Sequence, residues 1–294
     1  MTHSLGTALV TGASSGIGAV YADRLANRGY DLILVARNGG RLDAVAKRIR
    51  DATGRAIEVV AADLNNKADL RRVETLLRTN AGITMLVNNA GVGALHPLLE
   101  SDVDKMVDMI ELNVKALTRL TYAVAPGFVA RGGGTIINIS SAVAVWPELL
   151  NGVYGATKAF VLSLSLSLHK ELAGKNVRIQ AVLPGATATN FFDAAGGSAE
   201  QVPSGMMMPV DDLVDAALIG FDQGELVTIP SLPDAADWRA YEAARQKLIP
   251  NLSRSVPAAR HRTAAAAPMR IPRVLAFVGM IAACLWALAT VASA

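Results

Sequence analysis

Two residues of the segment NGVYGATKAF, at 151–160, could handle a proton together. Tyr154 and Lys158 stand four positions apart, and in a helix this spacing puts both side chains on one face. A free tyrosine has a pKa of about 10, and a nearby positive charge favours its phenolate form. The pair could therefore serve an oxygen on which negative charge develops, as the reduction of a carbonyl group requires. Because Tyr154 could also be a half-buried helix aromatic and Lys158 a solvated cation, the spacing alone does not decide.

A glycine-rich sequence, TGASSGIG at 11–18, directly follows the first apolar run of the chain. Gly12 allows a tight turn, Gly16 lets the backbone approach a pyrophosphate, and Gly18 lets the next helix pack close to the strand. The N–H groups and the dipole of that helix would then face the phosphates. The spacing differs from G-x-G-x-x-G and an ordinary turn is the alternative, but the position after a strand indicates a nucleotide site. The residues expected to bind the cofactor here are Gly12, Ser14, Ser15, Gly16, Ile17 and Gly18.

The end of the second apolar run indicates which dinucleotide is bound. An acidic residue at this point would accept hydrogen bonds from the adenosine ribose and repel an added phosphate. The chain instead has Ala36, Arg37 and Asn38, and a guanidinium can hold a 2′-phosphate through charge-assisted hydrogen bonds. We therefore expect Arg37 and Asn38 to select NADP(H) over NAD(H). A solvated surface cation is the alternative for Arg37.

A series of further motifs follows in order along the chain. The full series is TGASSGIG, Asp63 after the third apolar run, NNAG at 88–91, Asn113 in ELNV, Ser141 in NISS, YGATK at 154–158 and PG at 184–185. With this series the chain resembles the classical short-chain dehydrogenase/reductase (SDR) family over about residues 5–230. The set as a whole is highly specific, whereas each motif alone is not.

The resemblance implies a catalytic set of Asn113, Ser141, Tyr154 and Lys158. Ser141 would hydrogen-bond the substrate oxygen. Tyr154 and Lys158 would also contact the cofactor, Lys158 by holding the nicotinamide ribose. Asn113 would hold Lys158 through an ordered water and complete a proton relay. Taken singly, Ser141 could be a turn residue and Asn113 a polar residue that bends a helix, but agreement among the motifs favours the catalytic interpretation.

The resemblance also implies further contacts with the cofactor. One group would cap the adenine and line its ribose, and another would shape the nicotinamide pocket and bond the carboxamide. The adenosine-side residues are Asp63, Leu64, Asn89, Ala90 and Gly91. The nicotinamide-side residues are Pro184, Gly185, Thr187 and Thr189, of which Thr189 best matches the threonine position of the family.

Short apolar runs alternate with helical segments along the chain. The predicted strands are 6–12, 31–36, 56–63, 83–91, 134–140, 176–185 and 225–230. The helical segments expected between them include 16–29, 40–53, 66–81, 100–131 and 152–173. This alternation predicts an α/β fold of the Rossmann type, with a doubly wound, seven-stranded parallel sheet and helices on both faces. The segment 190–208, which contains Gly, Pro and Met residues, is expected to be a mobile loop.

The composition excludes several classes of protein. The chain has 294 residues, of which 52% are apolar and 18% charged, so a large core and no extensive disorder are expected. A single cysteine excludes an intrachain disulfide framework, and the four scattered histidines give no reason to assign a metal. Seven Lys and Arg but no acid follow Glu242, and subtracting them from the net charge of +3 leaves −4 for residues 1–242. We therefore expect no nucleic-acid partner.

The last 21 residues, 274–294, carry no charge. As a helix they would span about 31 Å, close to the roughly 30 Å of a bilayer's hydrocarbon core. We therefore predict a Rossmann-type catalytic domain at 1–242, a basic linker at 243–273 and a transmembrane helix at 274–294. The arginines of the linker would keep the catalytic domain in the cytoplasm. The alternatives are a buried hydrophobic helix and a tail that is not native to the protein.

Apolar side chains follow the expected catalytic serine and recur in the predicted loop. They are Ala142, Val143, Val145, Trp146, Phe191, Phe192 and Met206–Met208. Unless these residues belong to the core or to an oligomer interface, they would form an adaptable pocket for a hydrophobic carbonyl compound.

The sequence therefore predicts an NADP(H)-dependent oxidoreductase that interconverts a hydrophobic ketone or aldehyde and its alcohol. The alternative is a membrane-docked regulatory protein that senses NADP(H) without turnover, although a sensor would not need a proton relay. By analogy with the family, we also expect a homo-oligomer, a dimer or tetramer, that pairs through the helices at 100–131 and 152–173.

Overall fold

The computed structural model describes residues 5–262 apart from 190, 197, 199 and 201. Contacts divide the chain into two compact units, Met1–Leu232 and Pro233–Ala294. This division falls before the predicted boundary at residue 242, which lies within a helix, α9 (Ala235–Lys247). Every residue predicted for the active site belongs to the first unit.

One parallel sheet forms the centre of the first unit, and in the described residues it has seven strands in the order β3-β2-β1-β4-β5-β6-β7. They are β1 (Thr7–Thr11), β2 (Asp31–Ala36), β3 (Ile57–Ala61), β4 (Ile83–Asn88), β5 (Gly134–Ile139), β6 (Val177–Val182) and β7 (Val227–Thr228). The predicted Rossmann-type sheet is thus confirmed, although β7 is shorter than expected. The strand order reverses between β1 and β4, and in such sheets ligands bind outside the carboxyl ends of the strands at the reversal.

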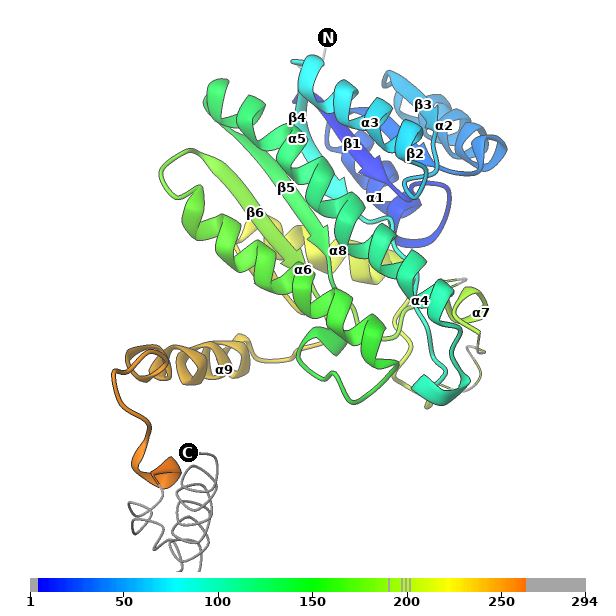
Figure 1. Ribbon diagram of the computed structural model, residues 1–294. Helices are drawn as coiled ribbons and strands as arrows, with labels where there is room; N and C mark the ends of the chain where they lie inside the picture. The colour runs from blue at the N-terminus through cyan, green and yellow to red at the C-terminus, as the bar shows by residue number, and fades with distance from the viewer. Residues whose placement is uncertain (1–4, 190, 197, 199, 201, 263–294) are drawn as a thin grey trace, which may run out of the picture. The chain divides into compact units, whose positions relative to one another are not determined.

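Helices cover both faces of this sheet (Figure 1). One layer consists of α1 (Gly16–Asn27), α2 (Gly39–Thr53) and α8 (Val210–Asp222), and the other of α3 (Lys67–Thr79), α5 (Leu117–Ala130) and α6 (Gly152–Glu171). Side chains of a strand point alternately to its two faces, so Val10 of β1 packs against the first layer and its neighbour Leu9 against the second. The apolar runs of the sequence are nearly continuous because both faces of the sheet are buried.

The helix predicted over 100–131 consists of several segments. After a short turn, η1 (Leu98–Glu100), α4 (Val103–Ile110) passes into a π-helical stretch, η2 (Glu111–Ala116), and α5 follows directly. A π-helical stretch widens one turn of the helix and often marks a functional site. Here it contains Asn113, one of the predicted catalytic residues.

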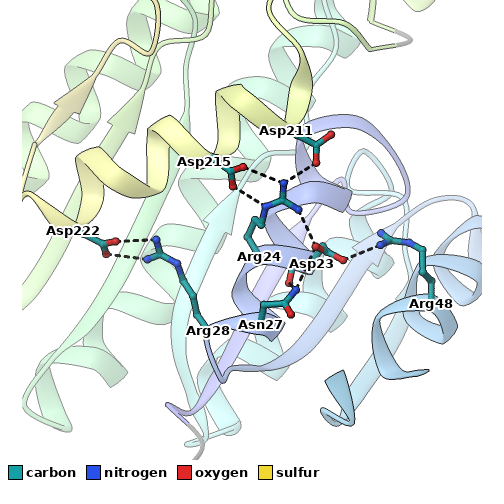
Figure 2. A network of polar contacts seen from close by, with 8 residues as sticks. All are labelled: Asp23, Arg24, Asn27, Arg28, Arg48, Asp211, Asp215 and Asp222. Atoms are coloured by element: carbon teal, nitrogen blue, oxygen red, sulfur yellow. Dashed lines mark hydrogen bonds and ion pairs between the residues drawn. The ribbon is translucent and has the colours of Figure 1, made fainter. Parts of the chain in front are cut away.

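A network of ion pairs joins α1 to α8 (Figure 2). The guanidinium of Arg24 donates from Nε and Nη2 to the Asp215 carboxylate, at 2.7 and 3.1 Å, and from Nη2 to Asp211 at 2.8 Å. One turn later, Arg28 donates from both Nη atoms to the carboxylate of Asp222, at 2.9 and 2.8 Å. Such paired bonds are geometrically specific. Because α1 begins at the glycine turn, the network also holds the helix that faces the predicted phosphate site.

The second unit contains α9 and two short turns, η5 (Ile249–Asn251) and η6 (Ala259–His261). The predicted transmembrane helix at 274–294 and the end of the predicted linker, from 263 to 273, lie outside the described residues. Among the helices that the structure does describe, none has the length and apolar character needed to cross a membrane.

Candidate active site

A cavity of about 1420 Å³ opens at the carboxyl ends of the central strands. It runs from Arg37 and Asn38 after β2, past the glycine turn, to Tyr154 and Lys158 on α6. Pockets for one small ligand usually measure about 300–1,000 Å³, so this cavity has room for a dinucleotide and a substrate together. All residues predicted for the site line it except Gly18 and Asn113.

The glycine turn at 12–18 has the shape needed to bind a pyrophosphate through its backbone. Gly12 and Gly16 have φ angles of +66° and +53°, which favour glycine. A Cβ atom on Gly12 would lie 2.7 Å from Asn89 Nδ2, and one on Gly18 would collide with the Gly12 carbonyl oxygen. Helix α1 begins at Gly16, so its first N–H groups lie at the wall of the cavity. The turn therefore fits the predicted dinucleotide.

The side chain of Thr11 fixes the ends of β1 and β4 beside each other. Its Oγ1 accepts hydrogen bonds from the backbone N–H groups of Asn89 and Ala90, both at 3.0 Å, and donates to the Val87 carbonyl at 3.2 Å. In return, Asn89 Nδ2 donates to the carbonyl oxygens of Thr11 at 2.9 Å and Gly12 at 3.3 Å. The predicted cofactor residues Asn89 and Ala90 thus support the glycine turn directly.

The end of the cavity beside β2, where the adenosine is expected to bind, carries two arginines. Arg37 is exposed and lines the cavity, and Arg41 lines it as well. Asn38 caps α2, because its Oδ1 accepts a hydrogen bond from Arg41 N at 2.9 Å. Asp63 Oδ1 accepts from Asn65 N at 3.0 Å, which orients the carboxylate after β3.

Tyr154 lies in the first turn of α6, and Asn151 fixes the start of that helix. The Oδ1 atom of Asn151 accepts hydrogen bonds from the backbone N–H groups of Val153 at 2.9 Å and Tyr154 at 3.3 Å. Its Nδ2 donates to the His96 carbonyl at 2.7 Å and to Ser101 Oγ at 3.1 Å. An N-cap contributes typically about 1 kcal/mol to stability. Here the same side chain also ties the backbone at Tyr154 to the segment that precedes α4.

Burial controls the protonation of Tyr154 and Lys158, which are 5% and 7% exposed. It raises the pKa of Tyr154 to about 12, and a hydrogen bond with Ser141 acts in the opposite direction. It lowers the pKa of Lys158 to about 8, so the ammonium form still dominates at pH 7. Lys158 Nζ donates to the Ile139 carbonyl at 3.0 Å and lies 5.9 Å from the centre of the Tyr154 ring. In the protein alone, the cost of burying a phenolate therefore exceeds the expected effect of the lysine charge, and Tyr154 keeps its proton.

Asn113 holds the segment after β4. Its Nδ2 donates to the Val92 carbonyl at 2.8 Å and to Thr157 Oγ1 at 3.1 Å, and its Oδ1 accepts from Val92 N at 3.0 Å. A Cβ on Gly91 would lie 3.0 Å from Asn113 Oδ1 and 3.5 Å from Lys158 Nζ, so both groups border this glycine. The side chain thus joins the segment after β4 to α6 beside Lys158.

Ser141 caps a short turn, η3 (Ala142–Ala144), directly after β5. Its Oγ donates to the Pro184 carbonyl and accepts from Val143 N, both at 3.4 Å. Both distances exceed the usual ranges for O–H···O and N–H···O hydrogen bonds, so both bonds are weak. The hydroxyl can therefore exchange them for a stronger bond to a substrate oxygen.

The predicted nicotinamide-side threonines are held by their own loop. Thr187 Oγ1 donates to the Gly185 carbonyl at 3.1 Å, and Thr189 Oγ1 accepts from Phe191 N at 3.2 Å. Thr189 also approaches the glycine turn, since its Cγ2 would lie 3.2 Å from a Cβ on Gly16. The segment predicted as a loop at 190–208 contains a short helix, α7 (Phe191–Ala194).

Apolar side chains surround Tyr154. The cluster consists of Ala94, Met109, Val143 and Tyr154, with Val92, Met106, Leu150 and Phe191 packed against it. Of the residues predicted to form the substrate walls, those that line the cavity are Ala142, Val143, Phe191, Phe192 and Met206. The other four predicted wall residues, Val145, Trp146, Met207 and Met208, do not line it. Trp146 is 51% exposed, and Met208 packs against the core.

The arrangement of cavity, glycine turn and buried tyrosine agrees with the comparison of the chain with known proteins. The family model for short chain dehydrogenase matches residues 6–198, more than half of the chain. The chain belongs to the short-chain dehydrogenase family. The predicted family membership is therefore confirmed.

Solved structures of other short-chain dehydrogenases resemble the chain over most of its length. A short-chain dehydrogenase from Sphingobium yanoikuyae in complex with NADPH is 50% identical, with a TM-score of 0.85 over 88% of this chain and 100% of the other. The bulky-bulky ketone specific alcohol dehydrogenase from Comamonas testosteroni is 45% identical, with a TM-score of 0.81 over 89% of this chain and 100% of the other. This short-chain dehydrogenase is accordingly an NADP(H)-dependent oxidoreductase that acts on hydroxyl and carbonyl groups.

A curated relative matches a shorter region. The very-long-chain 3-oxoacyl-CoA reductase of Anas platyrhynchos is 38% identical over 189 residues, which is 63% of this chain. The matched region spans 60% of the length of that reductase.

Several residues that build the site of this short-chain dehydrogenase were not predicted from its sequence. Arg41 lies in the first turn of α2, only four positions after Arg37. This short spacing could have predicted that both arginines line the same end of the cavity. Asn151 comes directly before Gly152, the first residue of α6, and is therefore at the N-cap position. Asparagine is a preferred N-cap residue, so this role could have been predicted from the sequence. The contacts of Met106, Met109 and Leu150 depend on how α4 packs against α6, and sequence spacing gave no signal for them.

Proposed function

We propose that this enzyme interconverts a bulky hydrophobic ketone and its secondary alcohol, with Tyr154 as the proton donor in the direction of reduction. One observation carries the proposal: Tyr154 is buried beside Ser141 and Lys158 within an apolar cluster at one end of a cavity whose other end holds Arg37. The name of the Comamonas testosteroni relative, which is specific for bulky-bulky ketones, supports the substrate class. The proposal also covers aldehydes that carry a large apolar group, with the corresponding primary alcohols as products.

The roles of the side chains follow from their positions. NADPH, which the glycine turn and Arg37 would hold, would supply the hydride that the carbonyl carbon receives. The Ser141 and Tyr154 hydroxyls hydrogen-bond the carbonyl oxygen, and Tyr154 transfers its proton to that oxygen as negative charge develops there. The Lys158 ammonium lies near enough to stabilise the tyrosinate that remains until a proton returns from solvent. Asn113 holds the segment after β4 against α6, so that Lys158 keeps its place.

A panel of carbonyl compounds tests the proposal. Purified enzyme with NADPH should reduce aryl and branched alkyl ketones with a higher kcat/KM than short polar ketones or keto acids, because apolar side chains surround Tyr154. Consumption of NADPH, followed by its absorbance, and recovery of the alcohol measure the reaction. Tight NADPH binding without turnover of any member would favour the alternative of a sensor protein, and a preference for keto acids would contradict the apolar pocket.

Arg37→Ala is expected to weaken NADPH binding about 10-fold or more and to change NADH binding little. The physical reason is that the guanidinium would hold the 2′-phosphate, which NADH lacks, and a hydrogen bond to a charged group contributes about 1.5–3 kcal/mol. Dissociation constants for both cofactors, measured by nicotinamide fluorescence, check this result.

Lys47→Ala is the matched control for the Arg37 variant. Lys47 is an exposed cation on the neighbouring helix α2, pairs with Asp51 at 2.5 Å and does not line the cavity. Its removal should leave both dissociation constants unchanged. Equal weakening of NADPH and NADH by Arg37→Ala would refute the 2′-phosphate assignment.

We further propose that the uncharged segment 274–294 anchors the enzyme to a membrane, with residues 1–242 as the catalytic domain in the cytoplasm and 243–273 as a basic linker. The length of the segment and its arginine flank support this. Deletion of 274–294 should move the protein from the membrane fraction to the supernatant and preserve kcat/KM for a water-soluble ketone. Full-length protein that stays in the supernatant would exclude the anchor.

We also propose that the enzyme is a homo-oligomer. Exposed apolar side chains on the helices expected to pair support it, among them Val103 and Val107 of α4, Tyr122 of α5 and Phe160 of α6. They are 71%, 50%, 66% and 38% exposed, respectively.

A further inference from the structure

We propose that Phe191 and Gly93 together determine how large a substrate group fits beside Tyr154. The Phe191 ring forms the wall of the pocket, and Gly93, which has no side chain, leaves room for that ring. The inference rests on the proposed reduction of a carbonyl compound. It concerns a single contact between two segments that are about a hundred residues apart in the sequence.

The Phe191 ring lies against the catalytic tyrosine. Its centre is 5.6 Å from the centre of the Tyr154 ring, and the two planes are inclined by 45°. Phe191 lines the cavity and packs against the apolar cluster that contains Tyr154 and Val143. A substrate whose carbonyl oxygen contacts the Tyr154 hydroxyl therefore places one of its substituents near this ring.

Gly93 creates the space in which the ring lies. A Cβ atom at this position would collide with Phe191 Cζ and would lie 2.6 Å from Phe191 Cε2. The backbone of Gly93 does not have a positive φ angle, so the position does not require glycine for conformational reasons. The absence of a side chain at Gly93 is therefore explained by the aromatic ring that occupies the space.

Further contacts fix the ring in this orientation. The backbone N–H of Phe191 donates to Thr189 Oγ1 at 3.2 Å, and Phe192 meets the ring edge-on, with 5.7 Å between the ring centres. A backbone hydrogen bond from Leu95 N to the Ala195 carbonyl, at 3.3 Å, joins the segment of Gly93 to the end of α7. The two segments are thus held side by side, and the Phe191 ring has a defined position in the cavity wall.

Opposite size preferences are expected from changes on the two sides of this contact. Phe191→Ala removes the wall and enlarges the space beside Tyr154. Gly93→Ala introduces a methyl group that pushes the ring away from Gly93, and because the ring borders the cavity we expect the space beside Tyr154 to become smaller. Enzyme pockets discriminate by roughly 10- to 200-fold for each methylene group that fits or fails to fit.

The test is a double-mutant cycle with wild type, Gly93→Ala, Phe191→Ala and the double variant. For each protein, kcat/KM is measured with NADPH on a ketone series that has one constant substituent and one of increasing size. Phe191→Ala should raise the ratio of large- to small-ketone kcat/KM about 10-fold or more, and Gly93→Ala should lower it by a similar factor. In the double variant the methyl group introduced by Gly93→Ala has no ring to displace, so this substitution should have no effect on the Phe191→Ala background.

Trp146→Ala is the control, because this exposed side chain does not line the cavity, and it should leave the ratio unchanged. Dissociation constants for NADPH show whether each variant keeps its fold and cofactor site. If wild type is active and the ratio of large- to small-ketone kcat/KM is the same in all variants, the inference is overturned and the proposed function stands. The same holds if Gly93→Ala still changes this ratio when Phe191 is absent. A wild type that binds NADPH but reduces no ketone overturns both.

Discussion

Replacing Tyr154 with phenylalanine is expected to lower kcat/KM for ketone reduction by roughly 10²–10⁴-fold, the range that a positioned proton donor contributes. The buried hydroxyl, whose pKa burial raises to about 12, keeps its proton at neutral pH and can donate it only when charge develops on a bound oxygen. Phenylalanine retains the ring that contacts Phe191 and the apolar cluster but has no proton to give. Steady-state kinetics with NADPH and the best ketone of the panel measure the loss.

A second buried tyrosine provides a matched control for this experiment. Tyr21 on α1 is 0% exposed, and its hydroxyl has no hydrogen-bond partner within the part of the chain that the structure describes. Tyr21→Phe should leave kcat/KM unchanged and, by removing an unsatisfied buried hydroxyl, should not lower the free energy of unfolding. Tyr154→Phe should bind NADPH as wild type does, since the substitution removes one oxygen atom and keeps the ring.

The result would contradict the proposed mechanism if Tyr154→Phe kept more than about a tenth of wild-type kcat/KM, since general acids contribute at least about 10²-fold. A loss of both activity and NADPH binding would show that the hydroxyl supports the cofactor site instead. The two outcomes are separated by measuring turnover and cofactor dissociation constants on the same preparation.

The sheet and the glycine turn could be predicted because their causes are local in the sequence. Seven apolar runs of strand length alternate with helical segments, and parallel strands buried on both faces leave this pattern. The positive φ angles of Gly12 and Gly16 require residues without a side chain at fixed positions after β1. Ser141 lies just after β5, and Tyr154 and Lys158 lie near the start of α6, the helix that connects β5 to β6. The order of the strands therefore brings all three to the same edge of the sheet.

Other features could not be predicted because they depend on packing between distant segments. The π-helical stretch at Glu111–Ala116 leaves no break in the apolar pattern that predicted one helix over 100–131. Helix α8 is not among the helical segments named from the sequence. Its position depends on the packing of side chains such as Leu213 and Leu218 in the core, and on ion pairs with Arg24 and Arg28 nearly two hundred residues earlier (Figure 2). The pKa of Tyr154 was expected to fall because of Lys158, but the sequence does not show that burial acts more strongly.

Lys158 lowers the free energy of unfolding because its charge is buried. Lys158 is only 7% exposed and keeps the ammonium form at neutral pH, and its described polar contact is the Ile139 carbonyl. A charge buried without an opposite charge destabilises the fold, and this shows as a lowered pKa for a lysine. Its retention is explained if the charge is needed beside the tyrosinate that proton transfer leaves behind.

Lys158→Met is therefore expected to lower kcat/KM by at least about 10²-fold and also to change how stability depends on pH. Below pH 8 the lysine is protonated in both folded and unfolded wild type, so the full cost of burying the charge is present. Between the folded pKa of about 8 and the unfolded value of about 10.4, the unfolded chain binds more protons, so wild-type stability rises with pH. Methionine does not titrate, so wild type should gain roughly 3 kcal/mol relative to the variant across this interval.

Urea unfolding of both proteins at pH 7, 8, 9 and 10 measures this difference, and comparing the two at each pH cancels the titration of all other groups. Lys47→Met is the control, because Lys47 is 74% exposed and its replacement should give a difference that does not vary over the same pH range. If the difference in the free energy of unfolding between wild type and Lys158→Met stays constant from pH 7 to 10, burial of the Lys158 ammonium does not destabilise the fold. If the difference rises while activity is unaffected, the buried charge has no part in catalysis and the role proposed for Lys158 is wrong.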